Sequence, residues 1–471
     1  RCPDGKFETE MSLRPLLEIA TANERIGALS AAIGAGEGTV EAYASAALRP
    51  YLLAALIDHP DGPGSRPVLI VTADDRSARD LTGDLRAYLQ PRSVHLYPSR
   101  GTTYESHIAP PPHLAGLRIA ALRALAESEP IVVASAIALA EAVPDKSLWP
   151  EGLALHKGES VDLTDVAVLL ADAGYERVDQ VEERGQFAIR GGILDVYPAT
   201  EERAVRVELF GDEIESLRWF SIFTQRSLGD AEQVELAPAA ELAAEHREAA
   251  EQIVERYRAP LDLVPEAALV AITASEEIPG ALRDHWEDVT TAMHADDARR
   301  FYVDPAEPLE AGAELALSAA DAGQELSFRA QSADFPSRTL AEAEGELEKL
   351  VRSGYRTVVA FEGRGEAERA RFNLSRIDVP FLSDRLPEEP GVSFAVASLR
   401  EGFLAPELKL AVIPQRRLLH RRRAATQVSA RARLAAAIEL RVGDLVVHED
   451  HGVARFSGFD TRTLAGTTRD Y

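Results

Sequence analysis

The sequence predicts a multidomain α/β protein in which a small α+β domain interrupts a parallel-sheet domain. Between residues 11 and 150, short apolar runs alternate with helical segments, which is typical of a doubly wound parallel sheet. Residues 151–237 contain alternating runs broken by glycines instead, which is typical of antiparallel strands. Buried-strand segments return after residue 238 and again between 325 and 415. We therefore expect the interrupted domain to resume and a further α/β domain to follow.

The first predicted domain begins with clear strand and helix signals. PVLIVTA (67–73) is an unbroken apolar run typical of a buried strand. RSARDLTGDLRAYL (76–89) places Leu81, Leu85 and Leu89 on one face of a helix. The same reasoning predicts strands at 93–98 and 130–135 and helices at 113–128 and 136–144, the last ended by Pro144.

The rest of the chain gives comparable signals. VRVELFGDEIESLRWF (205–220) predicts a hairpin that turns at Gly211-Asp212. ELAAEHREAAEQIVERYRA (241–259) predicts a helix. The other predicted elements are a strand at 267–274, a helix at 339–354 capped by Gly354, a strand at 356–363, a helix at 365–376, and strands at 392–398 and 408–414.

These signals divide the chain into seven segments. We expect the native start at Met11, which makes the first ten residues a leader. The segments are 1–10 (leader), 11–150 and 238–324 (two halves of the parallel-sheet domain), 151–237 (inserted domain), 325–415 (further α/β domain), 416–440 (basic connector) and 441–471 (strand-rich tail).

Composition limits the class of protein. The 471 residues are 46% hydrophobic, enough to fill several cores. No apolar run approaches the ~18–20 residues of a membrane span, and the first residues carry acids where a signal peptide needs an apolar stretch. A single cysteine, Cys2, excludes a disulfide framework. We therefore expect a cytoplasmic protein that does not contact a membrane.

Charge is distributed unevenly. The net charge of −26 repels phosphate backbones, so the chain should not grip DNA over its whole surface. The stretch 416–441 departs from this pattern with eight arginines and one acidic residue. It could contact nucleic acid, an acidic partner, or an acidic face of this chain, and the last interpretation is favoured. The basic connector carries Arg416, Arg417, Arg421, Arg422 and Arg423.

A search for catalytic chemistry finds none. The G-x-x-x-x-G-K-[ST] phosphate loop is missing, and GAGEG (34–38) carries only an acid, so a surface loop is expected there. Residues 40–56 predict a strand, a loop and a helix in the place of a nucleotide loop, but without glycine or lysine. His448 and His451 in VVHEDHG have no evident third ligand, so a structural turn is favoured over a metal site. We expect no catalytic residue, cofactor or metal.

The stretch RGQFAIRGGILDVYPA (184–199) offers a surface instead. In a strand, Phe187 and Ile189 share one face and Arg190 points to the other, so one face packs while the arginine is displayed. Arg177 and Arg184 lie on neighbouring segments. Displayed arginines on a rigid strand platform suit a protein-docking patch. The alternative is that they pair with the nearby acids Glu176, Glu182 and Glu183.

Two blocks of sequence resemble a known family. YERVDQVEERGQFAIRGGILDVYPA with RVELFGDEIESLRWF resembles the second domain of the excision-repair protein UvrB and its counterpart in Mfd, the bacterial transcription-repair coupling factors. The tail RVGDLVVHEDHGVARFSGFDTRTLAGTTRDY is similar to the start of the Mfd RNA-polymerase-interacting domain, a Tudor-like fold shared with CarD-type regulators. The lost nucleotide loop and this tail favour Mfd over UvrB. The resemblance implies a split, P-loop-like first domain.

The Mfd resemblance implies an adaptor function. Members of this family recognise RNA polymerase stalled at a lesion, displace it with an ATP-driven DNA translocase, and recruit UvrA for nucleotide excision repair. Family members bind UvrA through arginines on the strand face of the second domain, which implies roles here for Arg177, Arg184 and Arg190 beside Phe187. Their guanidinium groups would supply bidentate donors to acids on UvrA.

The family also implies a polymerase contact. It lies after HG-x-x-R-[YF]-x-G, on the strand that here carries Arg462, Thr463 and Leu464, with Arg455 and Phe456 as scaffold. Some relatives have leucine where Arg462 aligns, so Leu464 is the alternative apolar contact with the polymerase β subunit.

The translocase domains would lie beyond Tyr471, so ATP, magnesium and double-stranded DNA are expected only there. Two alternatives remain: a UvrB-like, DNA-damage-binding ATPase and a CarD-like transcription regulator.

Overall fold

The computed structural model has two compact units, residues 1–419 and residues 420–471. The structure describes residues 12–418 except 37, 102–109, 126–129, 223, 248–253, 293–294, 336, 338–339, 375, 384, 386 and 388, together with the segments 445–448, 452–455, 461–464 and 467–470. No helix among these residues is long and apolar enough to cross a bilayer.

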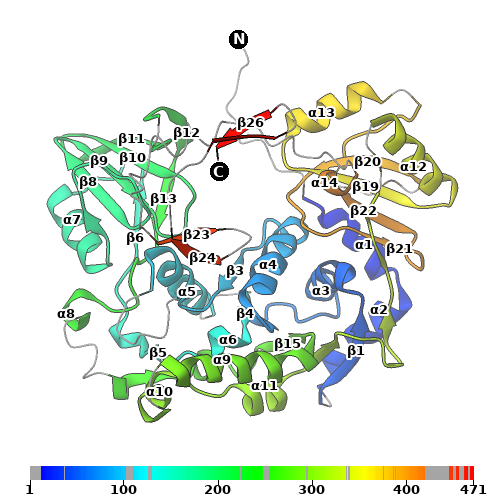
Figure 1. Cartoon of the computed structure of the whole chain (residues 1–471), viewed down its shortest axis with the longest axis horizontal. Helices are drawn as coiled ribbons and strands as arrows, with labels where there is room; N and C mark the ends of the chain where they lie inside the picture. The colour runs from blue at the N-terminus through cyan, green and yellow to red at the C-terminus, as the bar shows by residue number, and fades with distance from the viewer. Residues whose placement is uncertain are drawn as a thin grey trace. The chain divides into compact units, whose positions relative to one another are not determined.

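A seven-stranded sheet of parallel neighbours forms the first domain (Figure 1). Strands from before and after the insert pair with one another, so both halves of the interrupted domain contribute to one sheet. In sheet order they are β17 (Ser327–Phe328), β1 (Val40–Ala44), β16 (Leu315–Ser318), β15 (Leu269–Thr273), β2 (Val68–Thr72), β4 (Ile131–Ser135) and β3 (Val94–Tyr97). The predicted split α/β fold is therefore confirmed.

Helices cover both faces of this sheet. One core contains alternate strand residues with the helices α1 (Leu17–Thr21), α2 (Glu24–Ala35), α3 (Arg49–Asp58) and α4 (Asp75–Leu89). The opposite core contains the intervening strand residues with α5 (Pro112–Ala124), α6 (Ala136–Leu139), α9 (Ile278–Ala292) and α11 (Ala306–Gly312). α10 (Ala295–Phe301) and the short pair β5 (Val143–Pro144) and β14 (Tyr257–Arg258) complete this domain.

Two helix predictions were wrong in extent. The predicted helix 136–144 ends as α6 at Leu139, because Val143 and Pro144 pair with β14 instead. Of the predicted helix 241–259, the structure describes only α8 (Ala244–Arg247), and residues 254–258 form a 3-10 turn followed by β14. Tertiary strand pairing overrides helical propensity at both places.

The inserted domain is built on a six-stranded sheet. Its order is β12 (Ser227–Ala231), β11 (Glu213–Phe220), β10 (Ala204–Phe210), β9 (Ile193–Tyr197), β8 (Gln186–Arg190) and β7 (Glu176–Arg177). The apolar face of the sheet packs in one core with α7 (Leu163–Asp172) and the two-stranded pair β6 (Leu153–His156) and β13 (Gln233–Leu236). The predicted hairpin is confirmed, with Gly211 in the left-handed region at φ 69°.

A five-stranded mixed sheet forms the further α/β domain. Its order is β18 (Gln331–Ser332), β21 (Phe403–Ala405), β22 (Leu410–Pro414), β19 (Arg356–Phe361) and β20 (Gly391–Val396), with helices α12 (Leu340–Arg352), α13 (Arg364–Asn373) and α14 (Gln415–Leu418). The predicted cap of α12 is confirmed, because Gly354 adopts φ 82°. The second unit contains the hairpins β23 (Leu445–His448) with β24 (Gly452–Arg455) and β25 (Thr461–Leu464) with β26 (Thr467–Asp470).

Asp84 on α4 joins the parallel-sheet domain to this further domain. Its carboxylate is 3% exposed and accepts a hydrogen bond of 2.7 Å from the backbone N–H of Arg400. The Arg400 side chain pairs with Asp80, one turn earlier on α4, at 2.9 Å. Burial raises the pKa of Asp84 to about 7, because the carboxylate form is deprived of solvent.

We expect Asp84→Asn to make this domain junction less sensitive to pH. A carboxyl whose native pKa is raised holds its proton more tightly when folded, so its stabilising effect is greatest below pH ~4 and is lost as the pH rises towards 7. The amide oxygen of asparagine still accepts from Arg400. The free energy of unfolding of the variant, relative to that of wild type, should therefore be larger at pH 8 than at pH 5, by at most about 4 kcal/mol. Urea unfolding at both pH values measures this; a constant difference would contradict it.

Candidate protein-docking site

The inserted sheet brings two hairpin turns together at one end, which we call the hairpin end: residues 190–193 and 209–213. Gly191 and Gly192 connect β8 to β9, and the backbone N–H of Leu209 donates to the carbonyl of Gly192 at 2.8 Å. A Cβ atom on Gly192 would lie 3.0 Å from the carbonyl oxygen of Leu209, so glycine permits this close approach. Arg190 and Phe210, each next to one of these residues, therefore lie at the same end of the sheet.

The polar face of the sheet carries an arginine–carboxylate cluster. Arg206 on β10 donates to both oxygens of Asp195 on β9, at 2.6 and 2.8 Å, and Arg190 on β8 donates to the same carboxylate at 2.8 Å. Asp195 is 2% exposed, whereas the side chain of Arg190 is 54% exposed. The hydrogen bonds that Arg206 donates to Asp195 raise the pKa of Arg206. The shared carboxylate orients both guanidinium groups while leaving Arg190 open to a partner.

Phe210 is an exposed aromatic anchor that the sequence analysis missed. Its side chain is 81% exposed at the end of β10. Arg206, Glu208 and Phe210 alternate along one strand, which places phenylalanine on the polar side just before the Gly211-Asp212 turn. An apolar residue in phase with charged residues was the available signal. A large exposed aromatic side chain at the same end of the sheet as an exposed arginine matches the composition of protein-binding hot spots.

Phe187 was predicted to be a contact residue, and its position corrects that expectation. The side chain is 1% exposed and belongs to the core between the sheet and α7. Phe187 lies on the face of the sheet that α7 covers, whereas the neighbouring Ala188 lies on the same face as Asp195. We call the polar face of the sheet, with Arg190 and Phe210, together with Arg177 on the edge strand β7, the docking face. Phe187 can support this face from behind but cannot touch a partner directly.

Arg177 lies on the edge strand β7, next to β8, and Arg184 lies on the segment that connects these two strands. Arg177 is exposed on β7, and no ion pair of its side chain is found among the described residues. Arg184 is more restrained: its Nε donates to the Glu201 carbonyl at 2.8 Å and its Nη2 lies 3.5 Å from the Glu202 carboxylate. Among the described residues, no ion pair joins these arginines to Glu176, Glu182 or Glu183, but Arg184 and Arg190 pair with other acids of the insert, Glu202 and Asp195.

The connector and tail residues are described only in part. Arg416 and Arg417 lie on α14, where Arg416 is exposed and Arg417 pairs with Glu401 at 2.7 Å. Arg462, Thr463 and Leu464 lie on β25, opposite residues 467–469 of β26. Arg421, Arg422, Arg423, Phe456 and His451 lie outside the described residues. Within the described segments, no group of three His, Cys, Asp or Glu side chains could hold a metal.

Comparisons with known proteins agree with this geometry. Residues 153–242, which contain the whole docking face, match the UvrB interaction domain, and residues 440–471 match the CarD-like/TRCF RID domain. The transcription-repair-coupling factor of Bacillus subtilis is 27% identical over 86% of this chain and 41% of its own length. That of Mycobacterium tuberculosis is 29% identical over 86% of this chain and 40% of its own length.

A relative from Staphylococcus aureus, also a transcription-repair-coupling factor, is 24% identical over 90% of the chain and 42% of its own length. The chain thus spans about two fifths of the length of the curated relatives it matches. The resemblance expected from the sequence is confirmed, both in the two matched domains and over most of the chain.

Proposed function

Since this chain shares its UvrB interaction domain and its CarD-like/TRCF RID domain with transcription-repair-coupling factors, we propose that it recruits UvrA to RNA polymerase stalled at DNA lesions. The observation that carries the proposal is the exposed pair Arg190 and Phe210 at the hairpin end of the matched domain. In this proposal, the chain acts by binding rather than by catalysis, and it acts in the bacterial cytoplasm.

The docking face suits an acidic partner surface with an apolar socket. Arg190 projects a guanidinium group that Asp195 already orients, so little side-chain entropy remains to be lost on binding. Phe210 adds apolar area at the same end of the sheet. Arg177 supplies a further exposed cation. A carboxylate on UvrA would receive charge-assisted hydrogen bonds from these arginines.

The proposed polymerase contact uses the second unit. β25 and β26 form an antiparallel hairpin in the segment that matches the CarD-like/TRCF RID domain. Arg462, Thr463 and Leu464 on this hairpin are the proposed contacts with the β subunit. Double-stranded DNA would be bound only by a protein that also contains the translocase domains of the family.

We propose that the first domain has no ATP site, and the loop after β1 supports this. The Ser45 carbonyl accepts the backbone N–H groups of Leu48 and Arg49, at 2.8 and 3.2 Å, so these amides do not form a phosphate cradle. The Arg49 side chain turns back to the carbonyls of Ala44 and Ser318, at 3.0 and 3.1 Å. ATP and magnesium would be used by the translocase domains of the family.

The decisive experiment is capture of purified UvrA from the same organism by the immobilised chain at moderate salt. We expect a saturable complex that weakens as salt rises, because charge-assisted contacts are screened. Failure to retain UvrA would refute the proposed recruitment. A truncation that lacks residues 420–471 serves as a control, since it should bind UvrA as well as the whole chain does.

Addition of 1 mM ATP with magnesium should leave the thermal unfolding midpoint of the chain unchanged. A ligand at about 100 times its dissociation constant would stabilise the folded state by ~2.7 kcal/mol, enough to move the midpoint by several degrees. Differential scanning fluorimetry measures the shift. A rise of that size would favour the UvrB-like ATPase alternative.

A further inference from the structure

Helix α5 holds both points at which the chain crosses into and out of the inserted domain. At the entry, Arg123 donates to the Pro150 carbonyl at 2.5 Å and pairs with Glu151 at 3.3 Å. At the exit, Arg118 donates through Nε to Glu241 at 2.6 Å. One helix therefore contacts both connecting segments, the one that enters the insert and the one that leaves it.

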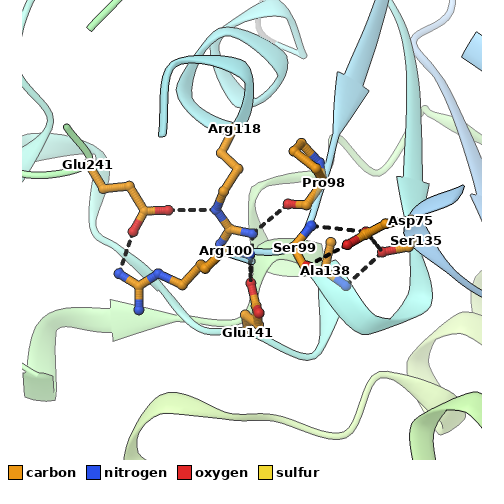
Figure 2. Close-up of polar contacts among 9 residues, drawn as sticks. All are labelled: Asp75, Pro98, Ser99, Arg100, Arg118, Ser135, Ala138, Glu141 and Glu241. Carbon is orange, nitrogen blue, oxygen red and sulfur yellow. Dashed lines mark hydrogen bonds and ion pairs between the residues drawn. The ribbon is translucent and has the colours of Figure 1, made fainter. Parts of the chain in front are cut away.

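Arg118 forms the centre of a buried charge cluster (Figure 2). Its side chain is 0% exposed, and its Nη1 donates to the Glu141 carboxylate at 2.9 Å and to the Pro98 carbonyl at 2.8 Å. Arg100 approaches from the other side and donates to Glu241 at 2.5 Å. We call Arg100, Arg118, Glu141 and Glu241 the ionic joint.

The charges of the joint depend on one another. Burial alone would raise the pKa of Glu241, but its two guanidinium partners outweigh this and lower it. A buried ion pair of this kind tolerates little displacement, because separating the partners leaves an uncompensated charge in the interior. The joint therefore favours one arrangement of its four side chains over neighbouring ones.

The parallel sheet holds the base of the joint in place. Asp75, which begins α4 after β2, accepts the backbone N–H of Ser99 at 3.0 Å and the hydroxyl of Ser135 at 2.5 Å (Figure 2). Ser99 lies between Pro98 and Arg100, so the loop that carries both joint contacts is tied to the ends of β2, β3 and β4. The sheet thus supports one side of the joint, and Glu241 supplies the side attached to the insert.

Backbone packing brings the insert close to the same helix. A Cβ atom on Gly116 of α5 would lie 2.8 Å from the Cβ of Ala199 in the insert and 3.0 Å from the carbonyl oxygen of Pro238, where the chain leaves the insert. Packing at Gly116 and the ionic joint at Arg118 therefore act within one turn of α5. Packing alone provides contact, whereas the joint provides directional bonds.

We propose that Arg118 is a positioning residue that fixes the orientation of the docking face relative to the parallel-sheet domain through the ionic joint. The inference deepens the proposed function, and it rests on that function only for the identity of the partner. A partner bound at the hairpin end would then be presented in one direction by the rest of the chain.

The test measures the distance between the two domains without any partner. Spin labels are attached in a Cys2→Ser background at Arg76→Cys on α4, whose side chain is 87% exposed, and at Glu215→Cys on the exposed side of β11. We expect one narrow distance distribution for the otherwise unchanged chain. Arg118→Met should widen it at least about twofold, and Arg118→Lys, which keeps the charge but loses the guanidinium fork, should narrow it again in part.

A second variant keeps the test decisive if Arg118→Met fails to fold. Arg118→Met combined with Glu141→Gln removes one charge of each sign and keeps Arg100 paired with Glu241, so no charge in the interior is left unpaired. We expect this variant to fold and to give the same wide distribution. A narrow, wild-type distribution in this variant would overturn the proposal in favour of packing alone. Arg218→Met, which removes an ion pair inside the insert, is the matched control and should leave the distribution narrow. Since UvrA is absent throughout, this outcome is independent of the capture experiment.

Discussion

Replacing Arg190 and Phe210 together by alanine should weaken UvrA binding on the order of a hundredfold, about 2–4 kcal/mol. The two side chains supply the exposed cation and the exposed ring of the hairpin end. The fold should survive, because Arg206 still holds both oxygens of Asp195. Isothermal titration of the chain with UvrA measures the loss.

A matched control for this double variant lies on α13. Phe372 is 89% exposed and Arg369 is exposed one turn before it, so Arg369→Ala with Phe372→Ala removes the same chemistry far along the sequence. UvrA affinity should stay within about 0.5 kcal/mol of wild type in the control. Equal affinities for the two double variants would rule out the hairpin end as the docking site. Arg177→Ala, added to Arg190→Ala, tests whether the edge strand β7 also contributes to UvrA binding.

Phe187→Ala should instead destabilise the inserted domain by about 3–5 kcal/mol. The ring is almost completely buried between the sheet and α7, so its removal leaves a cavity and loses apolar burial. Trp219 on β11 of the same domain reports unfolding by fluorescence in a Trp149→Phe, Trp286→Phe background. Urea titration of that chain, with and without Phe187→Ala, measures the difference.

Comparison with Phe210→Ala distinguishes a residue that stabilises the insert from one that contacts UvrA directly. Phe210 is mostly exposed, so its replacement should change the free energy of unfolding by less than about 0.5 kcal/mol while weakening UvrA binding. Phe187→Ala should reduce UvrA binding only in proportion to the fraction of insert that is unfolded. A stable Phe187→Ala variant with lost affinity would contradict the buried position and restore Phe187 as a direct contact.

The sequence by itself determined the layout of this protein. Unbroken apolar runs such as 67–73 can only be satisfied by burial on both faces, so they predicted strands of a covered parallel sheet, and β2 lies there. Alternation with glycine breaks predicted the antiparallel insert, and Gly211 adopts the left-handed conformation that the hairpin turn requires. These features follow from interactions between residues close in the chain.

Only the tertiary structure decided which residues form the proposed docking site. Alternation gave Arg190 and Phe187 opposite faces but did not say which face a core would cover, and α7 covers the one with Phe187. Phe210 lies at the same end of the sheet as Arg190 because the backbones of Leu209 and Gly192 are hydrogen-bonded, a contact that no local pattern encodes. Likewise, Glu241 meets Arg118 across a separation of 123 residues. Long-range pairing depends on the summed packing of the whole domain, and therefore only the folded structure shows it.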